Sequence, residues 1–136
     1  DWDKEEKFMK INFEGTKNIL NAAAMCHVKQ FIYLSSLGVL GDKDQDNYDE
    51  NSPYSLTSDF YSNSKIYTEI HLKKYCQEVE MPYTIIRPGF VYGPGDTKFM
   101  PRLLKKLKSK RFKYIKSKDN YINVVSINNV NGLLLE

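Results

Sequence analysis

Residues 31–36 read Phe-Ile-Tyr-Leu-Ser-Ser, a run of aromatic, β-branched and aliphatic side chains that ends in two serines. A short continuous apolar run is typical of a strand covered on both faces, as in a parallel sheet. A second run of this kind, Met81-Pro-Tyr-Thr-Ile-Ile86, is followed directly by Arg87. The two runs predict neighbouring strands at the centre of an α/β sheet.

Helical patterns flank both predicted strands. Apolar or small residues recur at three-to-four spacing over residues 4–27, and the pattern is helical again over about 58–79. The remaining predicted elements are a glycine-rich loop at 93–96, a helix at 98–108, short strands near 112–115 and 121–125, and a helix from about 128. This alternation predicts an α/β fold with parallel neighbours. Since only two strong central strands are present, we expect the sheet to be incomplete.

The composition and net charge are those of an ordinary globular domain. The 136 residues, 41% hydrophobic and 27% charged, have the size and composition of one modest domain. No apolar run is long enough to span a bilayer, and the net charge of +3 is too small to imply a nucleic-acid partner. Cys26 and Cys76 lack metal-ligand spacing, so we expect buried structural thiols, no metal site and a reducing, cytoplasmic location.

One sequence pattern indicates candidate catalytic residues. Tyr61-Ser-Asn-Ser-Lys65 places a phenol and an ammonium four residues apart, hence on one face of the predicted helix. Ser36 lies at the carboxyl end of the first strand, where ligands of open α/β sheets bind. We therefore expect the three side chains to line one crevice.

The three groups can move a proton at neutral pH. A free phenol has a pKa near 10, and we expect the Lys65 ammonium to lower the pKa of Tyr61 by Coulomb attraction. Tyr61 would then exchange a proton with a substrate hydroxyl or carbonyl. Ser36 would donate a hydrogen bond to the same oxygen.

With these residues in view, the chain resembles the extended short-chain dehydrogenase/reductase family, in its NAD-dependent epimerase/dehydratase and 3β-hydroxysteroid dehydrogenase-like branch. The matching segments are Asn12-Phe-Glu-Gly-Thr-Lys-Asn-Ile-Leu20, Phe31-Ile-Tyr-Leu-Ser-Ser-Leu-Gly-Val-Leu-Gly41, Asp49-Glu-Asn-Ser-Pro53, Tyr61-Ser-Asn-Ser-Lys65 and Arg87-Pro-Gly-Phe-Val-Tyr-Gly-Pro-Gly-Asp96. The resemblance implies a Rossmann-type doubly wound parallel sheet, here without its amino-terminal strands and carboxyl-terminal part.

The resemblance also implies roles for single residues. Tyr61 would be the catalytic acid/base, Lys65 would bind the ribose, and Ser36 would polarise the substrate oxygen. The implied contacts to NAD or NADP come from Leu34, Tyr61, Lys65, Pro88 and Val91. Asn12 would brace the helix behind the site. The family pairs two helices of each subunit in a four-helix bundle, so a homodimer of the full-length parent is expected.

Departures from the family pattern concern the ends of the chain. The glycine-rich dinucleotide fingerprint is absent, and we expect it upstream of Asp1, so that these residues alone would be inactive. Ser126 and Asn129 stand where relatives often carry a histidine and an aspartate. We interpret residues 1–136 as a partial NAD(P)-binding domain in which 96–136 begin the substrate-binding part.

Two features leave alternatives open. Arg87 ends a predicted strand at the crevice, so it contacts substrate or forms a structural salt bridge. Between Arg102 and Lys118 there are nine basic residues and no acidic one. This run would suit a phosphate-bearing substrate, a membrane surface or nucleic acid, but we favour a solvated helix and loop. No aromatic and arginine stacking pattern accompanies it, so we expect no nucleic-acid partner.

Together these observations predict an NAD(P)-dependent oxidoreductase or epimerase acting on a secondary alcohol or ketone. A 3β-hydroxysteroid dehydrogenase-like activity on a small-molecule substrate is favoured. The alternatives are a nucleotide-sugar epimerase or dehydratase, a non-catalytic dinucleotide-binding protein that kept the fold, and a basic binding module built on residues 102–118.

Overall fold

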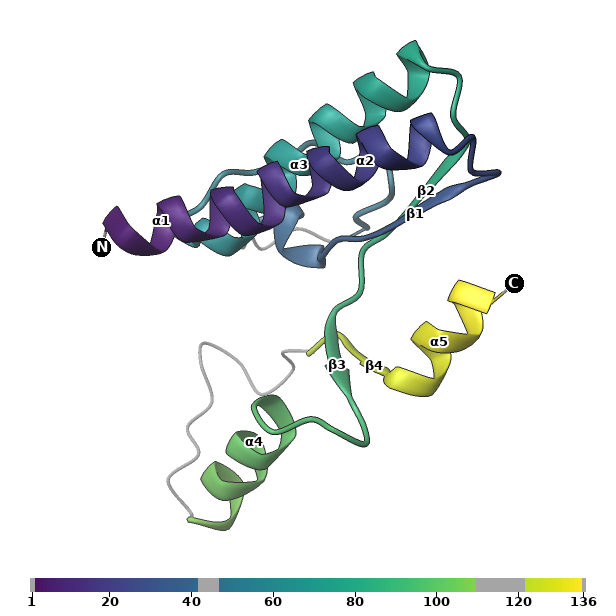
Figure 1. Ribbon diagram of the computed structural model, residues 1–136. Coiled ribbons are helices and arrows are strands. Elements are labelled where there is room, and N and C mark those ends of the chain that lie inside the picture. The colour runs from purple at the N-terminus through teal and green to yellow at the C-terminus, as the bar shows by residue number, and fades with distance from the viewer. Residues whose placement is uncertain (1, 42–46, 110–121, 136) are drawn as a thin grey trace. The chain divides into compact units, whose positions relative to one another are not determined.

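The computed structural model describes residues 2–41, 47–109 and 122–135, which form two compact units with a boundary between Arg87 and Pro88 (Figure 1). The elements in chain order are α1 (Trp2–Phe8), the π-helix η1 (Met9–Glu14), α2 (Gly15–Met25), β1 (Phe31–Leu34), the 3₁₀-helix η2 (Leu37–Leu40), α3 (Phe60–Glu78), β2 (Tyr83–Ile86), β3 (Phe90–Tyr92), α4 (Phe99–Lys108), β4 (Val124–Ser126) and α5 (Ile127–Leu135). Among the described residues, no helix is long and apolar enough to cross a bilayer.

The first unit is built on two parallel strands. β1 pairs with β2 in a register that places Phe31 opposite Tyr83 and Leu34 opposite Ile86. The pairing continues past the strand end, where the Ser35 amide donates to the carbonyl of Ile86 at 2.7 Å. Both predicted strands are thus confirmed, and so is the parallel α/β class.

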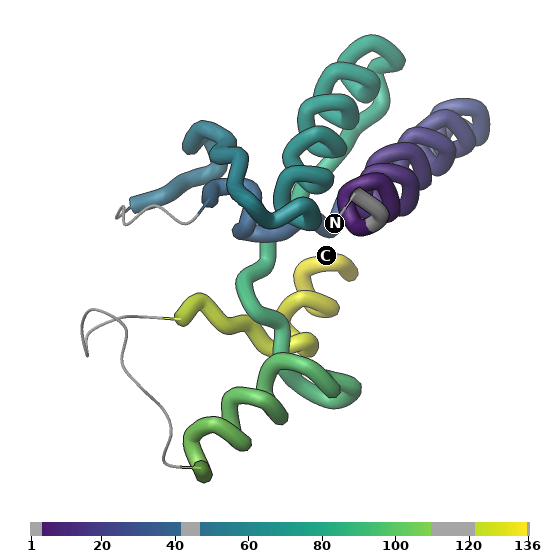
Figure 2. Tube along the Cα trace, turned by 90° about the vertical axis from the view of Figure 1, so that its left-hand side faces the viewer, coloured from purple at the N-terminus to yellow at the C-terminus, as the bar shows by residue number. Residues whose placement is uncertain are grey.

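Helices cover one face of this strand pair. The continuous run α1–η1–α2 lies beside α3 (Figures 1 and 2), and both contribute side chains to one cluster over β1. The side chain of Tyr33 points into the cluster, whereas Ile32 and Leu34 are 40% and 44% exposed on the opposite face. Within the first unit, helices cover the face of the strand pair that carries Tyr33, and the expected cover of the opposite face stays a prediction.

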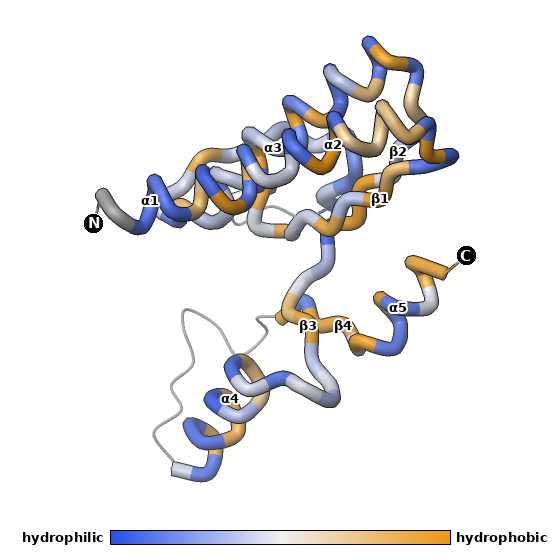
Figure 3. The backbone as a smooth tube through the Cα atoms, in the orientation of Figure 1, coloured by the Kyte–Doolittle hydropathy of each residue, from blue (hydrophilic) through white to orange (hydrophobic). Residues whose placement is uncertain are grey.

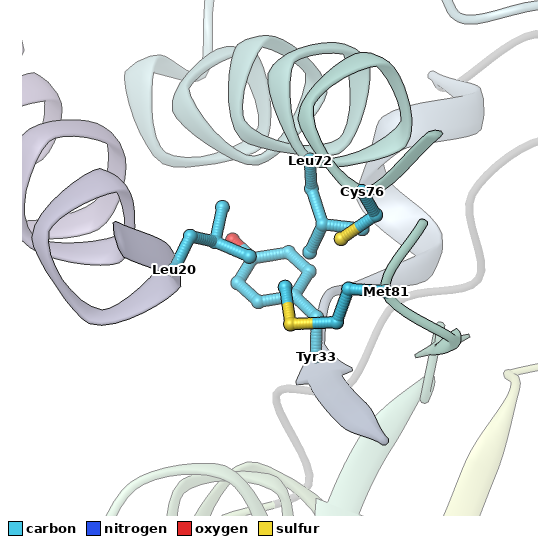
Figure 4. Close-up of a cluster of buried hydrophobic side chains, with 5 residues drawn as sticks. All are labelled: Leu20, Tyr33, Leu72, Cys76 and Met81. Carbon is cyan, nitrogen blue, oxygen red and sulfur yellow. The ribbon is translucent and has the colours of Figure 1, made fainter. Parts of the chain in front are cut away.

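The core of the first unit is small and contains much sulfur. Figure 4 shows Leu20 from α2 and Leu72 and Cys76 from α3 around the ring of Tyr33, with Met81 closing the cluster. Burying such side chains contributes about 1.5–3 kcal/mol each, so these contacts hold α2 and α3 on β1.

The predicted helix over 4–27 exists, but its centre is a π-helix. The Gly15 amide donates to the carbonyl of Lys10, five residues back, and this wider turn shifts the helix face that follows. Leu20 is buried, while Ile11, Ile19 and Cys26 are exposed. The expectation that both cysteines are buried is therefore right for Cys76 and wrong for Cys26.

The second unit contains a second pair of parallel strands. β3 pairs with β4, with Phe90 opposite Val124 and Tyr92 opposite Ser126. β3 was not predicted, because the pattern over residues 90–92 was assigned to no element and only the loop at 93–96 was expected. Helices α4 and α5 lie where they were expected, whereas the predicted strand at 112–115 falls outside the described residues.

Candidate active site

Ser36 directly follows the carboxyl end of β1. Its extended backbone caps the 3₁₀-helix η2, and its Oγ accepts a hydrogen bond from the Gly38 amide at 3.1 Å. Because the hydroxyl serves there as an acceptor, its own hydrogen remains available for a substrate oxygen.

Tyr61 lies in the first turn of α3. The side chain of Asp59 caps this helix by accepting from the amides of Tyr61 and Ser62 at 3.3 and 3.1 Å. An N-cap carboxylate of this kind fixes the start of a helix, so Asp59 determines where the phenol stands relative to β1.

Lys65 lies one turn further along α3 and reaches back to the sheet. Its Nζ donates to the carbonyl oxygen of Leu34 at 2.8 Å and lies 4.7 Å from the ring centroid of Tyr33. The same Nζ is 5.7 Å from the ring centroid of Tyr61. The ammonium is thus held between the end of β1 and the proposed acid/base.

The start of α3 and the Ser36 turn are in close contact. A Cβ added at Gly38 would collide with Oγ of Ser62 and lie 3.4 Å from Oγ of Ser36. Ser62 is buried and donates to Asp59, so it has little freedom to move. The turn after Ser36 thus lies against the first turn of α3, which carries Tyr61, and Lys65 of the same helix reaches the carboxyl end of β1. A joint catalytic role of the three residues stays a prediction.

The pKa of Tyr61 differs from the sequence expectation. Burial, followed by the Asp59 carboxylate, raises the pKa of the phenol above its ordinary value. Burial also lowers the pKa of the Lys65 ammonium, against an opposing effect of Glu69. The expected lowering by Lys65 is therefore wrong for the chain alone, because its ammonium does not offset the loss of water around the phenol.

The π-helix connects to α3 behind this site. Asn12 lies in η1, and its Nδ2 donates to Oγ of Ser64 at 3.0 Å. The Asn12 carbonyl accepts from the hydroxyl of Thr16 at 2.6 Å. The bond from Asn12 to Ser64 joins η1 to the turn of α3 that lies between Tyr61 and Lys65.

Arg87 forms the structural salt bridge that the sequence left open as one of its two roles, and its buried partner, Glu69, was not predicted. Nη2 of Arg87 lies 2.7 Å from Oε2 of Glu69, whose side chain is 0% exposed, and the Tyr54 hydroxyl donates to the same oxygen. Burial would raise the pKa of Glu69, but hydrogen bonds, that of Arg87 foremost, hold it below its ordinary value. A substrate contact by Arg87 stays a prediction.

The other predicted cofactor contacts belong to different parts of the chain. Leu34 offers its carbonyl to Lys65, and its own side chain is partly exposed at the strand end. Pro88 and Val91 belong to the second unit, with Val91 in β3. Their contact with a nicotinamide stays a prediction.

The donors at Lys65 suit the ribose of a dinucleotide. An ammonium carries three N–H donors, and one of them is engaged by the Leu34 carbonyl. The remaining two can donate to a pair of vicinal hydroxyls beside the exposed edge of Leu34.

Comparison with known proteins places this geometry in a family. The model of the NAD dependent epimerase/dehydratase family matches residues 1–127. The chain belongs to this family. Membership confirms the resemblance.

Relatives with different named activities match the chain. The chain is 35% identical over 112 residues to the sterol-4-alpha-carboxylate 3-dehydrogenase of Candida albicans, covering 81% of this chain and 32% of that protein. It is 33% identical over 107 residues to the dTDP-D-glucose 4,6-dehydratase of Mus musculus, covering 77% and 30%. The chain thus spans about a third of the curated relatives it matches.

A solved structure shows the same fold. The dTDP-glucose 4,6-dehydratase DesIV of Streptomyces venezuelae, with NAD and TYD bound, superposes with a TM-score of 0.77 at 22% identity. The match covers 96% of this chain and 42% of that one. The fold is therefore part of a Rossmann-type α/β domain, as the resemblance implied.

Proposed function

We propose that the whole protein is an NAD(P)-dependent dehydrogenase that acts on a secondary alcohol or ketone, with a 3β-hydroxysteroid or sterol as substrate. The observation that carries the proposal is the placement of Lys65 between the Leu34 carbonyl and the Tyr61 ring. The 35% identity to a sterol dehydrogenase supports the substrate class.

The chain's own residues would handle the proton and the substrate oxygen. A bound nicotinamide dinucleotide supplies the hydride acceptor or donor. Ser36 donates its free hydrogen to the substrate oxygen, and the Tyr61 phenol exchanges a proton with that same oxygen. Because burial raises the pKa of Tyr61, the phenol is protonated at rest. In the alcohol-oxidising direction it needs nearby positive charge, to which Lys65 contributes, before it can accept the proton.

A second candidate is a nucleotide-sugar epimerase or dehydratase. The 33% identity to a dTDP-D-glucose dehydratase favours it, and the same three side chains would serve. Turnover of a dTDP-hexose with no turnover of a 3β-hydroxysteroid would select this candidate.

We also propose that the whole protein is a homodimer. The helices that carry Asn12 and Tyr61 lie side by side (Figure 2), and each exposes apolar side chains. These exposed side chains are Ile11, Ile19, Tyr67 and Ile70. A second copy of the chain would cover them in a four-helix bundle.

The test of the activity is Tyr61→Phe in the full-length protein. We expect turnover with NAD⁺ and a 3β-hydroxysteroid to fall at least about 100-fold, the scale of a lost general base. Cofactor affinity should stay within a few-fold, because Lys65 remains. Tyr75→Phe, which removes a phenol further along α3, is the matched control and should keep wild-type turnover. Wild-type rates in Tyr61→Phe would refute the mechanism.

A further inference from the structure

Ser36 and Tyr61 lie on two separate segments of the first unit. Ser36 caps η2 after the end of β1, whereas Tyr61 lies in the first turn of α3. In the proposed function both hydroxyls reach the same substrate oxygen, so the reaction depends on the distance between the two segments. The segments are in contact at Gly38 of η2 and Ser62 of α3.

Position 38 requires glycine for reasons of space. The φ of Gly38 lies outside the left-handed region, unlike that of Gly41 in the same turn, which is 80°. Its backbone conformation is therefore one that residues with a side chain adopt. The obstacle to a side chain is Ser62, because an added Cβ would collide with its Oγ and lie 3.3 Å from its Cβ.

Ser62 is fixed where it stands by the N-cap of α3. It is 6% exposed, and its Oγ donates to Oδ2 of Asp59 at 2.6 Å. Turning the Oγ away from Gly38 would break this short bond. The same carboxylate accepts from the Tyr61 amide at 3.3 Å, so a displacement of Ser62 would move the turn that carries the phenol.

Gly38 is bonded to Ser36 on the other side of the contact. Its amide donates to Oγ of Ser36 at 3.1 Å, and an added Cβ would lie 3.4 Å from that oxygen. A shift of Gly38 would therefore change the position of the Ser36 hydroxyl.

Apolar packing fills the neighbouring part of the contact between η2 and α3. Val39 and Leu40 of η2 form one cluster with Ile66 of α3, and each of the three is 6% exposed or less. Figure 3 shows the apolar residues of α3 spaced among hydrophilic ones. Interiors packed in this way do not absorb an added methyl group, so a side chain at position 38 would push the two segments apart. The contact lies inside the first unit and does not depend on what covers the outer surface of that unit.

We propose that Gly38 and Ser62 are a matched pair of positioning residues that sets the separation between the Ser36 and Tyr61 hydroxyls. The missing side chain at position 38 makes room for the Ser62 hydroxyl, and this hydroxyl fixes the first turn of α3 through Asp59. Both residues act through their neighbours and not on the substrate itself. The inference rests on the proposed function, because it concerns two groups that act on one substrate oxygen.

The pair is tested by steady-state kinetics of the full-length protein with the substrate class that it turns over, a 3β-hydroxysteroid or a dTDP-hexose. Gly38→Ala should lower kcat about 10- to 100-fold, the scale expected when reacting groups are displaced by up to about 1 Å. The dissociation constant for NADH, measured by its fluorescence, should stay within a few-fold, because Lys65 and the Leu34 carbonyl lie outside this contact. Gly15→Ala is the matched control and should keep the wild-type kcat. Among the described residues, its added Cβ meets only the Lys10 carbonyl, at 3.9 Å.

A second substitution separates the fit of the pair from a general loss of stability. Combined with Gly38→Ala, Ser62→Ala removes the colliding oxygen and Ser62→Gly removes the Cβ as well, so kcat should rise in that order. In the otherwise wild-type chain the same two substitutions should lower kcat, because the bond from Ser62 to Asp59 is lost. Thermal unfolding shows whether each variant is folded. Where Gly38→Ala alone does not fold, the order of kcat in the two double variants decides.

Two results would overturn the matched pair: a wild-type kcat in Gly38→Ala, or double variants in which Ser62→Gly is no faster than Ser62→Ala. With Tyr61→Phe inactive in the same assay, either result removes the pair and leaves the proposed function standing. Wild-type turnover in Tyr61→Phe would instead refute the proposed function, and the role of the pair with it.

Discussion

Lys65 contacts both the end of β1 and the ring of Tyr61, the proposed acid/base. Its ammonium donates to the Leu34 carbonyl and faces the rings of both Tyr33 and Tyr61. A lysine whose pKa is lowered by burial is less firmly charged than an exposed one. Glu69, four residues on, opposes that effect, so the buried acid helps to keep the ammonium protonated beside the phenol.

Tyr33 gives the fold a pH dependence of its own. Burial raises the pKa of its phenol to about 12, and its hydroxyl has no hydrogen-bond partner among the described residues. In the unfolded chain the phenol ionises near pH 10. Between about pH 10 and pH 12 the unfolded state therefore binds fewer protons, and the free energy of unfolding should fall by about 1.4 kcal/mol per pH unit from this residue.

Tyr33→Phe should remove that slope. At neutral pH we expect its free energy of unfolding to stay within about 1 kcal/mol of wild type, because no hydrogen bond is lost. Urea unfolding at a series of alkaline pH values would measure the difference. Tyr67→Phe, at an exposed position, is the control and should keep the wild-type slope. Identical slopes in wild type and Tyr33→Phe would show that the phenol is not protected.

At the scale of elements, one ion pair joins α3 to the end of β2. Arg87→Ala would leave the fully buried carboxylate of Glu69 without its cation. Breaking a buried pair in this way costs about 3–5 kcal/mol. We expect a loss of this size in the free energy of unfolding from chemical denaturation.

An exposed pair on the same helix provides the comparison. Lys74→Ala removes a partner of Glu78 at a distance of 3.9 Å and should change the free energy of unfolding by less than about 0.5 kcal/mol. A small effect of Arg87→Ala would mean that the guanidinium is not needed for folding. The prediction that Arg87 contacts substrate would then gain weight.

Sequence patterns predicted where helices and strands lie better than they predicted which side of each one is buried. The strands around Tyr33 and Ile85 and the helix carrying Tyr61 follow from local periodicity, which depends on neighbours along the chain. The buried side of the first helix does not follow from periodicity. The π-helix around Asn12 rotates every later residue about the helix axis, and composition gives no signal of it. The raised pKa of Tyr61 was likewise hidden, since burial depends on packing between distant segments.

The candidate site could be predicted because each of its three residues belongs to a local sequence pattern. Ser36 ends a strand, and Tyr61 and Lys65 are one helical turn apart, so each can be read locally. Glu69 and Arg87 are 18 residues apart in sequence and meet only when α3 packs beside β2. Contacts of that kind require the fold itself.

At the scale of the whole molecule, the first unit keeps apolar surface exposed on its helices as well as on its sheet. Ile70 of α3 is 49% exposed and Ile19 of α2 is 61% exposed. Apolar side chains that gather on adjacent helices are typical of an interface with another subunit. In a symmetric dimer the same helix pair meets its own copy, so one substitution changes the interface twice.

Ile70→Glu should therefore dissociate the proposed dimer. Each subunit would bring an unpaired carboxylate into the bundle, and we expect the dimer dissociation constant to rise at least about 100-fold. Sedimentation velocity of the full-length protein over a dilution series would measure it. Leu56→Glu, an equally drastic change at an exposed loop residue of the same unit, should leave the dimer intact. A dimer in Ile70→Glu as stable as wild type would place the subunit interface elsewhere than on α3.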